Sequence, residues 1–290
     1  MPLLFRWFAI ICAVFIALTL SGCSAVRLGY NNAPTLAYWW LDGYFDFSTA
    51  QSNAMRAELV ALQDWHRKEE LPLLADLLKN LQAAAPNPVN PEQICAVYSY
   101  VQTRVLATSD RLVPAFAALS TNLQPAQLDH MARTFEKRNK QWREEWLEGS
   151  KAERTDLRTK KLQERAEAFY GRLDATQVAL LRNQVNNSDF DPSLNYREML
   201  RRQQDTLQTL RDLRNSNATE AQGQADIRAM LARALNSPDP AFRAYLATIT
   251  AQSCAALAAV HNSTSANQRQ RLAQTLQDYE TDARVLMQRP

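Results

Sequence analysis

The 290-residue sequence contains little glycine and little histidine. It has 6 glycines and 3 histidines. Loops that cradle phosphate groups depend on several glycines, whose backbone can approach the ligand closely, so this composition counts against enzymes that bind nucleotides through such loops. Three histidines also leave few ligands for a zinc site. We therefore expect no metal and no cofactor other than the covalent lipid considered below.

The charges of the chain nearly cancel. There are 33 Lys and Arg residues against 30 Asp and Glu residues, a formal net charge of +3. A surface that binds nucleic acid needs a clustered basic footprint. We therefore expect no nucleic-acid partner.

Common catalytic motifs are missing from the sequence. It has neither the G-x-S-x-G turn of α/β-hydrolases nor the H-E-x-x-H pattern of zinc proteases. Acidic residues are numerous, so a pair of carboxylates of the glycosidase kind stays open as an alternative. The prediction is that the protein is not an enzyme.

The long apolar run of the sequence lies at its beginning. Residues Trp7 to Leu20 are apolar except for Thr19, and they follow the positive charge of Arg6. A positive start, an apolar centre and an exit of small residues are typical of a secretory signal peptide. The run is short for a membrane span, which needs about 20 residues. We predict that residues 1–22 are a signal peptide.

Leu20-Ser21-Gly22-Cys23, at the end of this run, resembles the lipobox of bacterial lipoproteins. The resemblance implies cleavage before Cys23 and attachment of lipid to its sulfur and to the new amino terminus. Several acyl chains matter, because each buried CH2 contributes about 0.8 kcal/mol and one chain binds a membrane only marginally. Ser24, in place of an aspartate, resembles the signal for the outer membrane, so the expected location is the periplasmic side of that membrane. The alternatives are the inner membrane, the cell surface, or an ordinary signal followed by a chance cysteine.

Cys95 and Cys254 are the cysteines left after lipidation of Cys23. The compartment outside the inner membrane is oxidising, which favours a disulfide between them. Such a bridge would join an early helix to a late one. The alternative is two buried free thiols that pack as small apolar side chains.

The composition predicts an all-α protein, because glycine is scarce while Ala, Leu, Gln, Arg and Glu are abundant. We expect a bundle of eight to ten helices, some of them long and kinked by proline, as at Pro72. Residues 23–32 are predicted to be a lipidated tether that Asn32 ends as a helix cap, and residues 33–290 a single domain facing the periplasm. A boundary within that domain near residues 186–192 is the alternative.

Two stretches supply residues for binding. The aromatic run from Tyr38 to Phe47 contains Trp39 and Trp40, which could lie at lipid headgroups or stack on sugars, while the other interpretation is that the run closes the helical core. The segment from Leu123 to Gly149 alternates apolar and basic positions. Its candidate binding residues are Phe135, Trp142, Arg133 and Lys137.

Leu123-Gln124-Pro125-Ala126-Gln127 and Leu173-Asp174-Ala175-Thr176-Gln177 loosely resemble the LTxxQ motif of the periplasmic Spy and CpxP proteins. Gln124 and Asp174 replace the first threonine of the motif. The resemblance implies an all-helical, ATP-independent chaperone that holds unfolded proteins. Good helix-start chemistry explains the same residues equally well.

The mature chain is also similar to a family of uncharacterised proteobacterial lipoproteins. The similarity lies in Arg27 to Asn32, Tyr38 to Leu41, Ser253-Cys254 and His261 to Ser265. It implies an all-helical lipoprotein with no established activity.

These observations together predict a membrane-anchored, non-enzymatic module for binding, scaffolding or envelope assembly, whose partners are the membrane and another envelope protein. A Spy-type chaperone for unfolded proteins is the first alternative. A protein that binds peptidoglycan or another glycan is the second.

Overall fold

The computed structural model describes residues 22–216 and 218–288, and every regular element in these ranges is an α-helix. The twelve helices are α2 (Gly22–Asn31), α3 (Ala33–Phe45), α4 (Thr49–Ala84), α5 (Pro91–Arg111), α6 (Val113–Ser120), α7 (Pro125–Trp146), α8 (Lys151–Tyr170), α9 (Ala175–Asn186), α10 (Pro192–Asn215), α11 (Glu220–Leu235), α12 (Pro240–Ser263) and α13 (Ala266–Met287). The all-α prediction is confirmed. The predicted number of eight to ten helices is too low, partly because residues 22–31 form a helix. Most of the predicted signal peptide lies outside the described residues.

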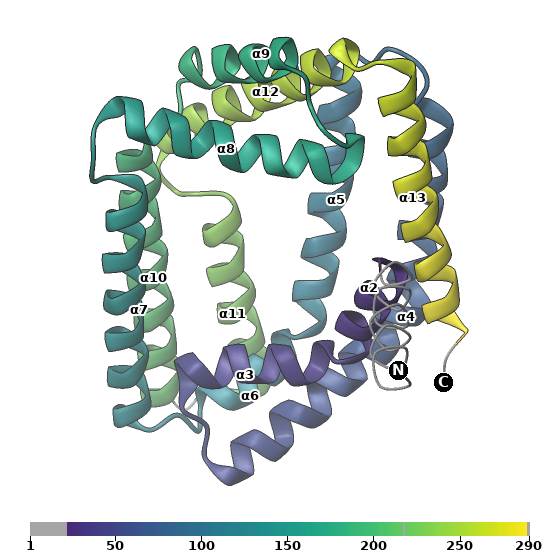
Figure 1. Cartoon of the computed structure of the whole chain (residues 1–290). Coiled ribbons are helices and arrows are strands. Elements are labelled where there is room, and N and C mark those ends of the chain that lie inside the picture. Colours follow the sequence, from purple (N-terminus) through teal and green to yellow (C-terminus); the bar gives the residue numbers. More distant parts are fainter. Residues whose placement is uncertain (1–21, 217, 289–290) are drawn as a thin grey trace, which may run out of the picture.

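The helices are arranged as a four-sided frame (Figure 1). One side contains α7, α10 and α11, and the opposite side contains α5, α13 and the end of α4. Helices α8, α9 and α12 connect these sides at one end, while α3, α6 and the start of α4 connect them at the other. Pro72 lies inside α4 without interrupting it, and the two halves of this long helix run in different directions.

The largest apolar core lies where α3, α4, α6, α7, α10 and α11 meet. Met131 of α7, Leu213 of α10 and Ile227 of α11 are almost completely buried there. A smaller core joins α4 to α13 through Leu71, Ala75, Ala283 and Leu286. Apolar burial, at about 25 cal/mol per Å², therefore stabilises mainly one end of the frame and the α4–α13 pair.

Two pairs of glutamine side chains each join the first turns of two helices that are far apart in the sequence. Gln51, in the capping box of Ser48, donates to Gln127 Oε1 (3.3 Å), and Gln127 donates back to Gln51 Oε1 (2.8 Å). Gln127 Nε2 also donates to the carbonyls of Phe45 and Asp46, both at 2.9 Å. The side chain thus satisfies backbone groups at the turn between α3 and α4, where helix ends leave carbonyls without partners.

The second pair has the same construction. Gln177 donates to Gln268 Oε1 (2.8 Å) and Gln268 donates to Gln177 Oε1 (2.9 Å). Gln177 also donates to the carbonyl of Ser263, and Gln268 to that of Arg172. The final glutamines of both LTxxQ-like segments therefore fasten helix starts to each other, and this structural role accounts for their spacing.

Residues 23–32 are predicted to be a tether, but Gly22–Asn31 form α2, which packs on α13 and α4 instead of extending from the body. Arg27 Nε lies 2.8 Å from Oδ1 of the buried Asp282. Burial raises the pKa of Asp282, and the charge of Arg27 limits that rise. Asn32, predicted to cap α3 with its side chain, instead donates from Nδ2 to the carbonyl of Leu28 (2.8 Å).

Cys95 and Cys254 form a disulfide with a Cα–Cα distance of 5.5 Å, as predicted. The bridge joins the first turn of α5 to the middle of α12. It connects positions 159 residues apart, so it links the early and late parts of the chain.

Candidate functional site

Exposed apolar side chains gather on two surfaces of the described molecule. We call the first the α5 face and the second the N-terminal apolar face. The α5 face consists of Tyr98, Val101 and Val105, with Leu106 beside them. The N-terminal apolar face consists of Leu36, Trp39 and Trp40 on α3. Gathered apolar surface of this kind marks sites of association, whereas single exposed apolar residues are ordinary.

The apolar residues of the α5 face recur at helical spacing, a pattern that in most helices marks the side packed against the core. Tyr98, Val101 and Val105 follow one another at spacings of three and four residues, which places them on one side of α5. Their exposed fractions are 49, 43 and 54 %. No residue of α5 is buried. The helix therefore presents to solvent the side that its sequence makes apolar.

Helix α5 is fastened near its two ends. At its start are the disulfide of Cys95 and a pair of hydrogen bonds between Asn262 and the backbone of Val89. Toward its end, Asp110 pairs with Arg228 of α11 at 2.8 Å. These connections hold the α5 face in place without covering it.

The aromatic run of α3 divides between two sides of the helix. Tyr38, Leu41 and Phe45 are buried in the main core. Trp39 and Trp40 are 61 and 57 % exposed. The prediction that the run closes the core is therefore correct for one side of α3 only.

Of the four candidate binding residues of α7, two are half-buried and two are exposed. Phe135 is half-buried against Tyr44, with ring centroids 5.5 Å apart. Trp142 is half-buried and stacks on Tyr196 of α10, with ring centroids also 5.5 Å apart. Arg133 and Lys137 are exposed. The structure therefore does not bring the aromatic and basic residues of this segment together as one binding surface.

Two histidines each pair with a tyrosine of another helix and so hold the two helices together. Tyr30 of α2 lies 3.0 Å from His66 Nδ1 of α4, and Tyr170 of α8 lies 2.9 Å from His261 Nδ1 of α12. His261 Nε2 is 2.8 Å from the carbonyl of Asn87, so Nε2 carries the proton and Nδ1 accepts from Tyr170. Burial raises the pKa of both tyrosines to about 12 and lowers the pKa of both histidines.

An ion-pair network on α10 is a feature that the sequence analysis missed. The buried carboxylate of Glu198 accepts hydrogen bonds from Arg201, Arg202 and Ser237. Burial acts to raise the pKa of Glu198, but these hydrogen bonds prevail and lower it. Glu198 and Arg201 are three residues apart on one helix, a spacing that allows the pair, whereas Ser237 comes from a distant turn.

Beside this network is a groove of about 310 Å³ between α7, α10 and α12. Of the titratable groups that line it, Glu198 has a shifted pKa, and its oxygens are already hydrogen-bonded within the network. In residues 22–216 and 218–288, no three His, Cys, Asp or Glu side chains converge on a point where a metal ion could bind. The same ranges contain no helix long and apolar enough to cross a membrane.

Comparison with known proteins identifies a family for most of this structure. Residues 43–232 match the model of a family of unknown function, DUF6279. The chain belongs to this family. No match was found among curated proteins or among solved structures. The part of the chain that the DUF6279 model matches begins in α3 and ends in α11, so it includes the whole α5 face.

Proposed function

We propose that this DUF6279 protein is a lipoprotein anchored at Cys23 in the outer membrane, facing the periplasm, and that it is a non-enzymatic binding module. Its ligand is an apolar segment of another envelope polypeptide, and its binding surface is the α5 face. The observation that carries the proposal is the exposed stripe of Tyr98, Val101 and Val105 on a helix that is fastened near its ends.

A polypeptide suits this surface better than a small molecule. The stripe from Tyr98 to Val105 extends over eight residues, or about 10 Å along the helix axis. It is an open helix side, whereas small-molecule sites enclose most of their ligand. In one common mode of recognition, a helix lays apolar anchors at helical spacing against an apolar groove or segment of its partner, and α5 carries such anchors. The fastened ends favour binding, because little order remains to be imposed on α5.

The position of Cys23 decides how close a lipid attached there would lie to the body of the protein. This residue lies in the first turn of α2. The other end of α2 is held on α4, where Tyr30 contacts His66 and Asn31 contacts Arg67. Arg67 Nη2 donates to Asn31 Oδ1 (3.0 Å), and Gln63 donates to the carbonyl of Tyr30. A lipid on Cys23 would therefore keep the body of the protein close to the bilayer.

Crosslinking in intact cells tests the binding surface. A photoreactive amino acid is placed at Val101 and, as a matched control, at Val60, a valine of α4 with 50 % exposure. We expect one discrete adduct from position 101 and none of the same mass from position 60. The adduct should disappear when V105D is added, and the partner identified from it should bind the purified protein but not its V105D variant. Equal adducts from both positions would contradict the proposal.

The anchor has its own test. We expect the C23S variant to lose its lipid and to leave the outer-membrane fraction, while the unchanged chain remains there after washing with high salt. A C23S protein that stays in that fraction and still carries lipid would show that the anchor lies elsewhere.

A chaperone of the Spy type is the second candidate, because the exposed α5 face would also suit unfolded clients. A chaperone differs from the specific binding module in the number of proteins that it binds. A chaperone gives a broad distribution of adducts from position 101, and its purified form suppresses aggregation of an unrelated denatured protein at an equimolar ratio. A single adduct without suppression favours the specific binding module.

A further inference from the structure

The N-terminal apolar face is the second exposed apolar surface, and it lies on α3, the helix that follows the one containing Cys23. Leu36, Trp39 and Trp40 occupy one side of α3, at spacings of three and four residues, while the opposite side is buried in the main core. Val26 and Leu28 of α2 are also exposed, but their spacing of two residues places them on different sides of that helix. Two exposed tryptophans side by side are uncommon on a protein surface in contact with water only, because Trp is highly buried on average.

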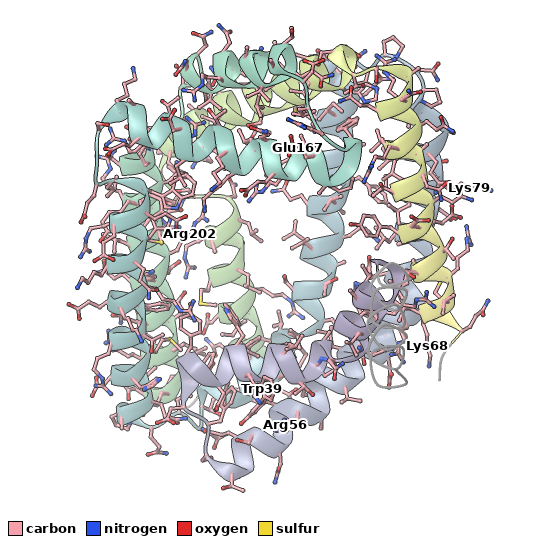
Figure 2. All side chains as sticks on the ribbon, in the orientation of Figure 1. Trp39, Arg56, Lys68, Lys79, Glu167 and Arg202 are labelled. Atoms are coloured by element: carbon pink, nitrogen blue, oxygen red, sulfur yellow. A yellow bond between two sulfur atoms is a disulfide. The ribbon has the colours of Figure 1, made fainter. Side chains whose placement is uncertain are left out.

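One basic side chain lies close to these tryptophans, and another lies on the far side of α3. On α4, the guanidinium of Arg56 lies 3.4 Å from the ring centroid of Tyr38, which faces the core and not the side of Trp39. Figure 2 shows Trp39 and Arg56 at the same end of the frame. On α7, the guanidinium of Arg138 lies 4.8 Å from the ring of Tyr44, whose centroid is 5.0 Å from that of Trp40.

Further positive charge follows on α7. Arg133 and Lys137 are exposed, each one position before a residue that faces α3, namely Thr134 and Arg138. Exposed acidic residues lie beside or on the same helices, among them Asp46, Asp129 and Glu136, so the charge there is mixed. Exposed tryptophans favour the headgroup region of a bilayer, where a cation such as Arg138 can pair with a lipid phosphate.

From these observations we propose that the N-terminal apolar face rests on the headgroup region of a phospholipid bilayer, with Trp39 and Trp40 inserted between lipids. The inference rests on the lipid anchor at Cys23, because the anchor supplies the high local concentration that makes a small contact effective. The consequence is a fixed orientation, in which the end of the frame containing α3 faces the membrane.

Fluorescence quenching by brominated lipid tests this orientation. The complete lipidated protein is extracted in detergent and reconstituted into vesicles of phosphatidylethanolamine and phosphatidylglycerol, with or without bromine on the acyl chains. Three forms are compared: the unchanged chain, W39F/W40F, and the control W142F/W146F, whose tryptophans lie on α7. Phenylalanine keeps an apolar ring at each position, and circular dichroism verifies that each variant is folded.

We expect brominated lipid to quench the unchanged chain and the control by a similar absolute intensity. We expect W39F/W40F to lose more than about two-thirds of that quenched intensity, because Trp at the interface is within reach of the bromine. If W39F/W40F keeps the quenching, the proposed orientation is wrong although the anchor stands. If the protein fails to float with the vesicles, the anchor is wrong and this inference falls with it.

Discussion

Helices α7 and α5 are both amphipathic, yet only α7 is covered on its apolar side. Leu128 and Met131 of α7 are buried between α3 and α10. Tyr98, Val101 and Val105 of α5 remain in solvent. The two helices also differ in how they are held, because Gln127 fixes the start of α7 inside a core, whereas a disulfide and surface contacts fix α5 near its ends.

The difference shows that an apolar stripe in the sequence specifies a side of a helix but not what covers it. On α7 the covering partner is within the chain, so the stripe contributes to folding. On α5 the described part of the chain supplies no cover, so the stripe is available to another molecule. Substitutions in the two helices should therefore have opposite consequences for stability and for binding.

The largest expected effect on stability comes from the disulfide that holds α5. Replacing both cysteines in C95A/C254A removes a link across 159 residues, and the chain-entropy relation gives a loss of about 5 kcal/mol as an upper value. Urea unfolding of the variant and of the unchanged chain measures this loss. Equal midpoints for the two proteins would contradict the role of the bridge as the main fastening of α5.

Core truncation in α7 should have the next largest effect. We expect M131A to lower the free energy of unfolding by about 2–5 kcal/mol, because it leaves a cavity among buried neighbours. The matched substitution V105A on α5 should change it by less than about 0.5 kcal/mol, because Val105 is half exposed. Similar losses in the two variants would remove the distinction between the helices.

A smaller effect is expected from the glutamine at the start of α7. In Q127L, the carbonyls of Phe45 and Asp46 lose a donor, and Gln51 loses its partner. A loss of about 1–3 kcal/mol should follow, because buried polar groups are then unsatisfied. Thermal unfolding measures it, with Q93L, whose glutamine caps the exposed start of α5, as the control that should lose less.

The smallest effect is a dependence on pH. Burial lowers the pKa of His66 and His261 below the ordinary value of 6.5, so the unfolded chain takes up protons at a pH where the folded chain does not. Stability should be complete above about pH 6.5 and should fall below it, by at most about 1.4 kcal/mol per pH unit for each histidine. Unfolding curves between pH 7.5 and 5.5 measure the slope. In H261N that slope should be smaller, and an unchanged slope would show that His261 does not contribute.

The sequence was sufficient for the helical class. Ser48, Asn90 and Asp191 cap helices as their residue types predict, and the pairing of the two remaining cysteines follows from the expected compartment. These features depend on local chemistry or on a small number of candidates. That is why they could be read without the structure.

The candidate site could not be predicted in the same way. The spacing of Tyr98, Val101 and Val105 is the same whether a neighbouring helix covers them or not. Likewise, Trp39 and Tyr38 are adjacent in an aromatic run, and only the packing of α3 on α4 and α7 decides which of them is buried. The partner of Gln127 lies 76 residues away, so its role in joining two helix starts required the fold.

Footprinting of tyrosines in intact cells tests the central claim most directly. Hydroxyl radicals label exposed side chains, and Tyr98 on the α5 face can be compared with Tyr279, an exposed tyrosine of α13. We expect Tyr98 to be reactive in the purified protein and protected several-fold in cells, while Tyr279 reacts equally in both. If Tyr98 is as reactive in cells as in the purified protein, no partner covers the α5 face and the proposed binding function is wrong.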